Sequence, residues 1–170
     1  MEKALAVINE MTENALIKNY AIGGGIAAIF YIEPILTYDL DIFFIPGNGN
    51  DGLLVLAPLY DFLKRRGYLP EKEHIVIEGI PVQFLPVYNE LIVEAVENAE
   101  ITPYKSIKTR VIKAEYLIAI MLQTNRAKDK ERVMKFIEDA EVDKELLETI
   151  LIKFNLKEKF ENLMRLYNEC

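Results

Sequence analysis

The feature that most constrains the fold is a run of three glycines between two apolar segments. Gly23 is the last of the strand-like residues 19–23. Gly24 and Gly25 follow it and precede the helix-like residues 26–32. Glycine adopts backbone conformations that other residues avoid, and it lets another group approach the main chain closely. Backbone N–H groups at the start of a helix favour an anion. The run therefore predicts a tight strand-to-helix turn that can bind a phosphate, with a turn that binds nothing as the alternative.

Two aspartates follow on the next strand-like segment, residues 39–45. On a strand, Asp39 and Asp41 point to one face, while Leu40 and Ile42 point to the other and can enter the core. Two neighbouring carboxylates repel each other unless a cation compensates them, and Mg²⁺ prefers carboxylate and phosphate oxygens. A solvated strand end is the alternative. Together with the glycine turn, the pair indicates a site for a metal-bound nucleoside triphosphate.

The rest of the chain predicts an α+β (α/β) fold, a small mixed β-sheet flanked by helices and followed by a helical C-terminal part. We expect a core domain over residues 1–112 and a helical region over 113–170 that packs on it. Strands are expected at 74–77, 80–85 and 109–112. Helices are expected at 2–17, 53–66, 90–99, 114–123, 128–140, 143–153 and 156–168, with Asp143 as an N-cap. The segment 46–52 has the composition of a loop.

Composition excludes several classes of protein. About half of the 170 residues are hydrophobic, which is enough for a core, and no apolar run reaches the ~18 residues needed to cross a membrane. We expect no signal peptide and a cytoplasmic protein. Cys170 and His74 are the only cysteine and histidine, so neither a disulfide framework nor a cluster of such ligands is expected. His74 itself is expected at a strand edge.

The net charge of −7 is unevenly distributed. Residues 1–100 carry 15 acidic and 6 basic side chains, and the chain as a whole is too acidic for a general nucleic-acid binder. Residues 101–170 carry 12 acidic and 14 basic side chains, and two basic clusters stand out there: Lys105, Lys108, Arg110 and Lys113, then Arg126, Lys128, Lys130, Arg132 and Lys135. These clusters are either solvated helix faces or a counter-charge for phosphates bound by the first half.

Two segments carry a resemblance to a known family. The order of a glycine turn, a helix and Asp-x-Asp on a strand resembles the nucleotidyltransferase superfamily, which includes polymerase β and the minimal nucleotidyltransferases. Residues 115–133 resemble the Leu-Ile-Ala-x-Lys-Leu-x-x-x-Arg-x-x-Asp element of its AbiEii-type, toxin-related branch. The resemblance covers residues 18–135 and identifies the fold better than the reaction.

The resemblance implies a metal-dependent transfer of a nucleotide group, with Mg²⁺ or Mn²⁺ as cofactor and an NTP as substrate. It implies that Asp39 and Asp41 are catalytic and hold the metal. It further implies that Gly24 and Gly25, with Gly23 before them, cradle the β and γ phosphates.

Three residues of the second segment are candidates for nucleotide binding. The resemblance implies that Arg126 or Lys128 reaches a phosphate and that Asp129 positions the nucleotide or a basic neighbour. The alternative is an exposed helix N-terminus, where an acid in the first turn is favourable to the helix dipole.

The chain departs from the family pattern at two positions. Family members carry a third carboxylate on a neighbouring strand, and the matching position here is Gln83. A glutamine amide can offer a carbonyl oxygen to a metal, but it brings no charge and is not a useful base. Met121 stands where the related branch often has lysine, and it is expected to pack in the core.

The leading interpretation is an enzyme that transfers a nucleotidyl group from an NTP to a hydroxyl of RNA or protein. The Gln83 departure supports a second interpretation, a catalytically weakened nucleotide-binding regulatory module, such as a toxin–antitoxin component with a toxin or antitoxin as partner. A third is a scaffold whose helical tail binds a partner, with no nucleotide role. None of these interpretations involves a membrane.

Overall fold

The computed structural model describes residues 1–32, 36–47 and 55–168. The chain forms two compact units: Met1–Ala27 with Leu36–Ile112, and Ala28–Ile35 with Lys113–Cys170. The first unit holds the β-sheet and the second is helical wherever it has regular structure. The chain changes from mixed to helical structure after residue 112, where it passes from the first unit into the second.

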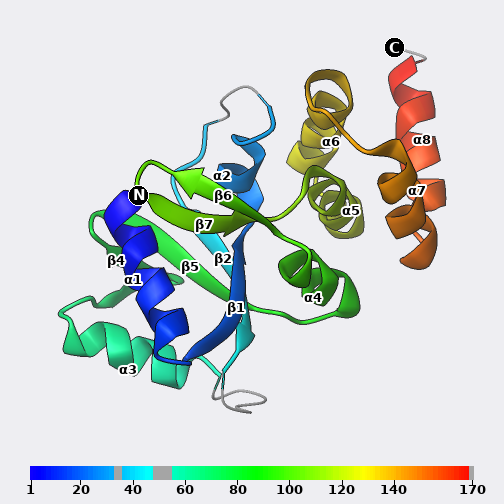
Figure 1. The fold of residues 1–170 in the computed structure, drawn as a ribbon. Helices are drawn as coiled ribbons and strands as arrows, with labels where there is room; N and C mark the ends of the chain where they lie inside the picture. The colour runs from blue at the N-terminus through cyan, green and yellow to red at the C-terminus, as the bar shows by residue number, and fades with distance from the viewer. Residues whose placement is uncertain (33–35, 48–54, 169–170) are drawn as a thin grey trace. The chain divides into compact units, whose positions relative to one another are not determined.

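The first unit is built on a mixed, seven-stranded sheet in the order β3-β4-β5-β2-β1-β7-β6 (Figure 1). Strand β2 pairs antiparallel with β1 and parallel with β5, and β1 pairs parallel with β7. The outer pairs, β3 with β4, β4 with β5 and β6 with β7, are antiparallel. The strands are β1 (Ile17–Ile22), β2 (Leu40–Pro46), β3 (Pro70–Glu71), β4 (His74–Ile77), β5 (Ile80–Pro86), β6 (Glu100–Tyr104) and β7 (Ile107–Val111). The expected α+β fold with a small mixed sheet is confirmed.

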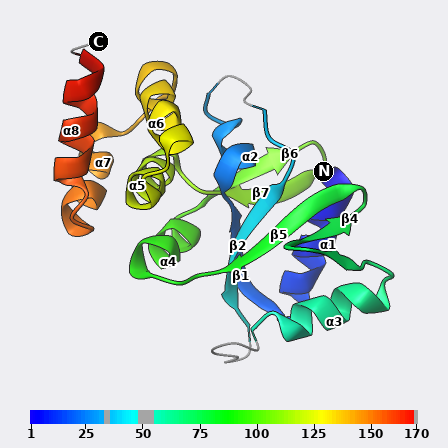
Figure 2. The same ribbon diagram turned by 180° about the vertical axis from the view of Figure 1, so that it is seen from behind.

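Helices α1 (Glu2–Glu13) and α4 (Glu90–Glu97) cover opposite faces of this sheet (Figures 1 and 2). Tyr20 on β1 donates a 2.6 Å hydrogen bond to Asn9 on α1, and its hydroxyl lies 3.1 Å from that of Thr109 on β7. The next residue, Arg110, points to the other face, where it donates to the carbonyl of Val96 in α4. The remaining helices in this part of the chain are α2 (Gly24–Ala28) and α3 (Ala57–Arg65).

The face toward α1 is an apolar core, and it follows from the alternation of side chains along each strand. Leu40, Ile42 and Phe44 on β2 are fully buried, as their spacing predicts. Their neighbours on the same face are also buried and apolar: Ile22 on β1, Ile75 and Ile77 on β4, and Val82 and Phe84 on β5. The odd-numbered residues of β2 consequently point to the opposite face.

The second unit contains α5 (Ala114–Thr124), α6 (Ala127–Asp139), α7 (Lys144–Lys153) and α8 (Lys157–Asn168). Asp143 is the N-cap of α7, as predicted, because its Oδ1 accepts hydrogen bonds from the N–H groups of Glu145 and Leu146, both at 3.0 Å. The N–H of Asp143 in turn donates to the buried carboxylate of Glu115 on α5 at 2.7 Å. This contact joins the starts of α5 and α7.

Several boundaries differ from the sequence expectation. Helix α1 ends at Glu13 rather than at residue 17, since Ala15 adopts a left-handed φ of 55° that no α-helix continues. Strand β6 was not expected, and the predicted strand 109–112 is in fact β7, from Ile107 to Val111. Residues 48–54, which include most of the predicted loop and the start of the predicted helix 53–66, lie outside the described residues. In the described part of the chain, no helix combines the length and apolarity that a membrane span requires.

Candidate functional site

The glycine turn lies directly against strand β2. The N–H of Gly23 donates a 2.9 Å hydrogen bond to the carbonyl of Asp41, which ties the end of β1 to the start of β2. Gly24 has a φ of +57°, a conformation that favours glycine. A Cβ placed on Gly24 would overlap Oδ2 of Asp41. The Asp41 carboxylate therefore rests on the bare backbone of the turn.

Each of the other two glycines also meets a side chain, one from β2 itself and one from the segment that leads into it. A Cβ on Gly23 would overlap the ring of Phe43, and one on Gly25 would lie 2.5 Å from Oγ1 of Thr37. Packing against these side chains is thus enough to require glycine at all three positions. Helix α2 has only five residues, so its dipole contribution at the turn is small. What the turn can offer a phosphate is its backbone N–H groups.

The two aspartates and Gln83 lie on one face of the sheet. Strand β2 begins at Leu40, so Asp39 immediately precedes the strand and Asp41 is its second residue. Asp41 pairs in register with Gln83 on the parallel strand β5, and side chains so paired point to the same side. Asp39 has 44% of its side chain exposed, whereas Asp41 and Gln83 are half-buried. Gln83, at the position where the resemblance implies a third acid, is thus adjacent to Asp41 and carries no charge.

His74 reaches the same group of side chains. His74 is the first residue of strand β4, which lies between β3 and β5 in the sheet. Its Nε2 lies 3.6 Å from Oδ2 of Asp39. That nitrogen is buried and has no hydrogen-bond partner among the described residues. The sequence marks His74 only as the single histidine of the chain, and the pairing of β4 with β5 and of β5 with β2 places it here.

This donor set fits a divalent cation that is held jointly with a triphosphate. Two carboxylates, the amide oxygen of Gln83 and a buried imidazole nitrogen are all metal ligands. Among the described residues, no group of three or more His, Cys, Asp or Glu side chains is close enough to hold a metal ion by itself. Mg²⁺ is commonly bound by one or two carboxylates plus substrate phosphates rather than by an all-protein cage. A metal ion held here would need further ligands, which phosphate oxygens could provide.

The predicted phosphate contacts of the helical part lie in the second unit, at the start of α6. Asp129 is fully buried and accepts hydrogen bonds from Nε of Arg126 at 2.6 Å and from Oγ1 of Thr124 at 2.8 Å. Burial by itself raises the pKa of Asp129, but these hydrogen bonds and the Arg126 charge outweigh it and hold the pKa below its ordinary value. Asp129 thus holds Arg126 in place, while Lys128 is exposed.

Arg110 and Met121, two other residues named from the sequence, have structural roles. Arg110 donates to the backbone carbonyls of Tyr20, Val96 and Glu97, so it joins β1, β7 and the end of α4. Met121 is half-buried and lines a cavity of about 170 Å³ in the second unit, beside Val133.

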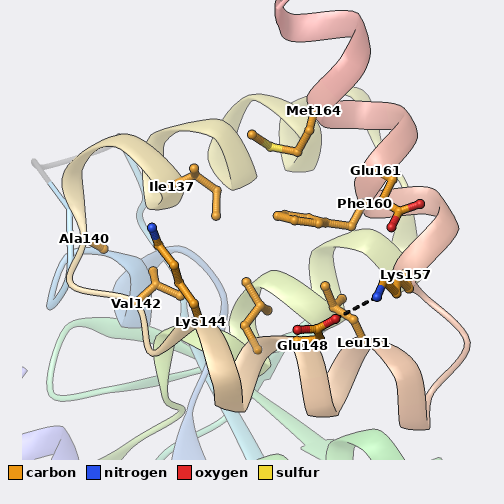
Figure 3. A pocket seen from close by; sticks show the side chains of 11 residues that line it. Ile137, Ala140, Val142, Lys144, Glu148, Leu151, Lys157, Phe160, Glu161 and Met164 are labelled. Carbon is orange, nitrogen blue, oxygen red and sulfur yellow. Dashed lines mark hydrogen bonds and ion pairs between the residues drawn. The ribbon is translucent and has the colours of Figure 1, made fainter.

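A larger cavity of about 510 Å³ lies among α6, α7 and α8 of the second unit (Figure 3). Apolar side chains form most of its wall, among them Ile137, Leu151, Phe160 and Met164. The Lys157 ammonium lies at the wall but is bound to Glu148 at 2.7 Å. Two further charged residues, Lys144 and Glu161, also line the cavity, so its apolar wall has a charged rim.

The fold is that of known nucleotidyltransferases. A crystal structure of ANT(2'')-Ia in complex with adenylyl-2''-tobramycin matches with a TM-score of 0.54 and 18% identity, over 92% of this chain and 95% of that one. A solution structure of the antibiotic-resistance factor ANT(2'')-Ia matches with a TM-score of 0.51 and 13% identity, over 98% and 96%. A Thermotoga maritima protein assigned to the nucleotidyltransferases matches with a TM-score of 0.45, too low to support an argument.

Comparison with models of protein families finds no match, and comparison with curated proteins finds none either. The likeness to ANT(2'')-Ia is therefore one of fold. The AbiEii-type branch, to which the sequence element 115–133 is similar, stays a prediction.

Proposed function

We propose that this chain is a metal-dependent nucleotidyltransferase that moves a nucleotidyl group from an NTP to a hydroxyl. The observation that carries the proposal is the Asp41 carboxylate against Gly24 of the glycine turn, with Asp39 two residues earlier, in a chain with the fold of ANT(2'')-Ia. RNA and protein are the acceptor classes implied by the family resemblance. Tobramycin, adenylylated in the complex of ANT(2'')-Ia, adds an aminoglycoside to the acceptors worth testing.

In this proposal each residue of the site has a distinct role. Asp39 and Asp41 hold Mg²⁺ or Mn²⁺, which neutralises charge on the triphosphate and favours the deprotonated acceptor hydroxyl. Backbone N–H groups of Gly24 and Gly25 donate to phosphate oxygens and orient the chain of phosphates. The acceptor oxygen then bonds to the α-phosphorus, the bond from that phosphorus to the bridging oxygen breaks, pyrophosphate leaves, and the acceptor proton passes to water.

The family resemblance adds one further role to the proposal. It implies that Arg126 or Lys128 reaches a phosphate, to which either side chain brings positive charge. Asp129 acts through Arg126, which it fixes by two hydrogen bonds, at 2.6 and 3.2 Å. Asp129 is therefore a positioning residue rather than a nucleotide contact.

Gln83 supports a second candidate, a nucleotide-binding regulatory module with weakened or absent turnover. It stands beside Asp41 where a charged ligand and base would be expected, and an amide replaces neither function. Such a module would bind NTP and metal without transferring a nucleotide. An association with a toxin or antitoxin stays a prediction from sequence.

The test of the first candidate is transfer of label. The protein is incubated with each α-labelled NTP, Mg²⁺ or Mn²⁺, and RNA, protein extract or tobramycin as acceptor. We expect labelled product from the wild type and its loss, by at least ~10³-fold, in Asp41→Asn, because the metal loses a carboxylate ligand. Asp61→Asn, an exposed change on α3, is the matched control and should behave as wild type. A folded wild-type protein that labels nothing with any NTP would count against the enzyme.

Gln83→Asp separates the two candidates. If the wild type only binds nucleotide, restoring the acid beside Asp41 should create transfer or raise it greatly. If the wild type already transfers and Gln83→Asp gains nothing, the weakened-module interpretation is wrong. Calorimetric binding of NTP with metal to both proteins shows whether the substitution acts on binding or on turnover.

A further inference from the structure

His74 has a buried ring nitrogen that lies near a carboxylate without forming a hydrogen bond to it. Its Nε2 has no hydrogen-bond partner among the described residues, although 31% of the side chain is exposed. An unsatisfied buried polar atom costs about 1–3 kcal/mol, and in a native protein it commonly marks the place of an ion or water. Oδ2 of Asp39 lies 3.6 Å from this nitrogen.

The distance between these two atoms is near that of two ligands sharing one cation. At 3.6 Å, Nε2 of His74 and Oδ2 of Asp39 are too far apart for a hydrogen bond. Two neighbouring ligands of one octahedral Mn²⁺ ion, each about 2.1–2.2 Å from it and about 90° apart, lie about 3.0 Å from each other. The two atoms would thus have to approach by about half an ångström to bind one such ion, a shift that rotation of the Asp39 side chain can supply.

The strand register places His74 next to Gln83, the uncharged residue of the site. Strand β4 pairs antiparallel with β5 through Ile75 and Val82, both buried in the core. One step further along the ladder, His74 comes opposite Gln83, and Gln83 pairs with Asp41 on β2. The three side chains form a row on one face, with the neutral amide in the middle.

We propose that His74 is a metal ligand of this site and takes the place of the third carboxylate that Gln83 does not provide. Its Nε2 and the Asp39 carboxylate bind one cation, whose remaining positions are open to Gln83 Oε1, phosphate and acceptor oxygens. The proposal rests on the proposed function, since it refines the metal site of the same reaction. It also predicts a metal preference: Mg²⁺ is bound almost entirely through oxygen, whereas Mn²⁺ has the higher affinity for a site with nitrogen. The site should select Mn²⁺ over Mg²⁺.

Pulsed electron paramagnetic resonance on bound Mn²⁺ tests the ligand directly. His74 is the only histidine, so an untagged protein has a single imidazole that can couple to the ion. The probe is Mn²⁺ with inorganic tripolyphosphate, which contains no nitrogen. We expect ¹⁴N coupling of a directly bound imidazole, and its replacement by ¹⁵N coupling when the protein is labelled with ¹⁵N-histidine. The labelled wild type keeps the test valid even if a variant fails to fold.

Metal affinities measured by competition give an independent readout. We expect His74→Asn to abolish the nitrogen coupling and to weaken Mn²⁺ binding at least about tenfold, with a smaller loss for Mg²⁺. Gln83→Ala is the matched control from the adjacent strand and should keep the nitrogen coupling. Circular dichroism of each variant verifies folding.

The outcomes separate this inference from the proposed function. Mn²⁺ bound without nitrogen coupling would overturn the role of His74 and leave the aspartate site intact. Equal losses of Mn²⁺ and Mg²⁺ affinity without coupling would show that His74 only positions Asp39. If neither metal binds with tripolyphosphate, the proposed function and the inference both fail.

Discussion

Gly24 is the residue at which the candidate site is most sensitive to a small change. Its φ of +57° and the Asp41 carboxylate against its Cα both exclude a side chain. The requirement is set by packing between β1 and β2, and it holds whether or not a phosphate binds. Substitution therefore reports on the position of Asp41 as well as on the turn.

Gly24→Ala should weaken binding of Mn²⁺ with ATP by more than about tenfold, because the added methyl group displaces the Asp41 carboxylate. The left-handed conformation should also cost about 1–2 kcal/mol of stability. Calorimetry and thermal unfolding measure the two effects.

Gly67→Ala provides the matched control for this change. Gly67 also has a positive φ, +85°, but a Cβ there meets no atom within 4 Å. It should lose similar stability and keep wild-type binding. Equal binding by both variants would contradict the proposed site.

Among the secondary-structure elements, the helices of the second unit were the most predictable. Their apolar periodicity and the cap at Asp143 are local properties, and each of α5 to α8 begins within about two residues of its expected start. Strand β6 was not predictable in this way, because most of its residues are exposed or half-exposed and do not alternate with buried ones. It exists by pairing with β7, and Pro103 is compatible with its place at the sheet edge.

The N-cap of α7 provides a test at the level of one helix. Asp143→Ala removes the acceptor for two backbone N–H groups and should lower the free energy of unfolding by about 1 kcal/mol. Asp143→Asn should retain most of that stability, because an asparagine oxygen also caps. Asp139→Ala, at an exposed position at the end of α6, is the control and should change stability by less than ~0.5 kcal/mol. Urea denaturation measures all three, and an unchanged Asp143→Ala would show that the cap contributes nothing.

For the molecule as a whole, ligand binding should appear as a gain in stability. A ligand that binds only the folded state at 100 times its Kd adds about 2.7 kcal/mol. We expect Mn²⁺ with a non-hydrolysable ATP analogue to raise the unfolding temperature, and EDTA to reverse the rise. ATP analogue without metal should have little effect, since Asp39 and Asp41 would then repel the phosphates.

Hydrogen exchange under the same conditions identifies the segments that contact the ligand. Protection should increase at the glycine turn, residues 23–25, and at the start of β2. If Arg126 or Lys128 binds phosphate as proposed, protection should also increase at the start of α6. Protection confined to the second unit would contradict a nucleotide site at Asp39 and Asp41.

The sequence by itself determined those features that depend on neighbours along the chain. Alternation placed Leu40, Ile42 and Phe44 in the core and the two aspartates on the opposite face, because successive side chains of a strand point in opposite directions. Glycine at three consecutive positions indicated a tight turn for the equally local reason that only glycine tolerates such close approach.

Only the tertiary structure decided which distant residues meet. Glu78 and Gly79 between two strand-like segments predict a hairpin, and β4 and β5 do pair antiparallel around that turn. Nothing in the local pattern of residues 74–85 states that β5 pairs with β2, since that pairing is chosen by burial of apolar faces over the whole unit. That choice brings Gln83 beside Asp41 and His74 within 3.6 Å of Asp39. It also gave the glycines their partners in Phe43, Asp41 and Thr37, so the turn that first indicated a phosphate site is required by packing as well.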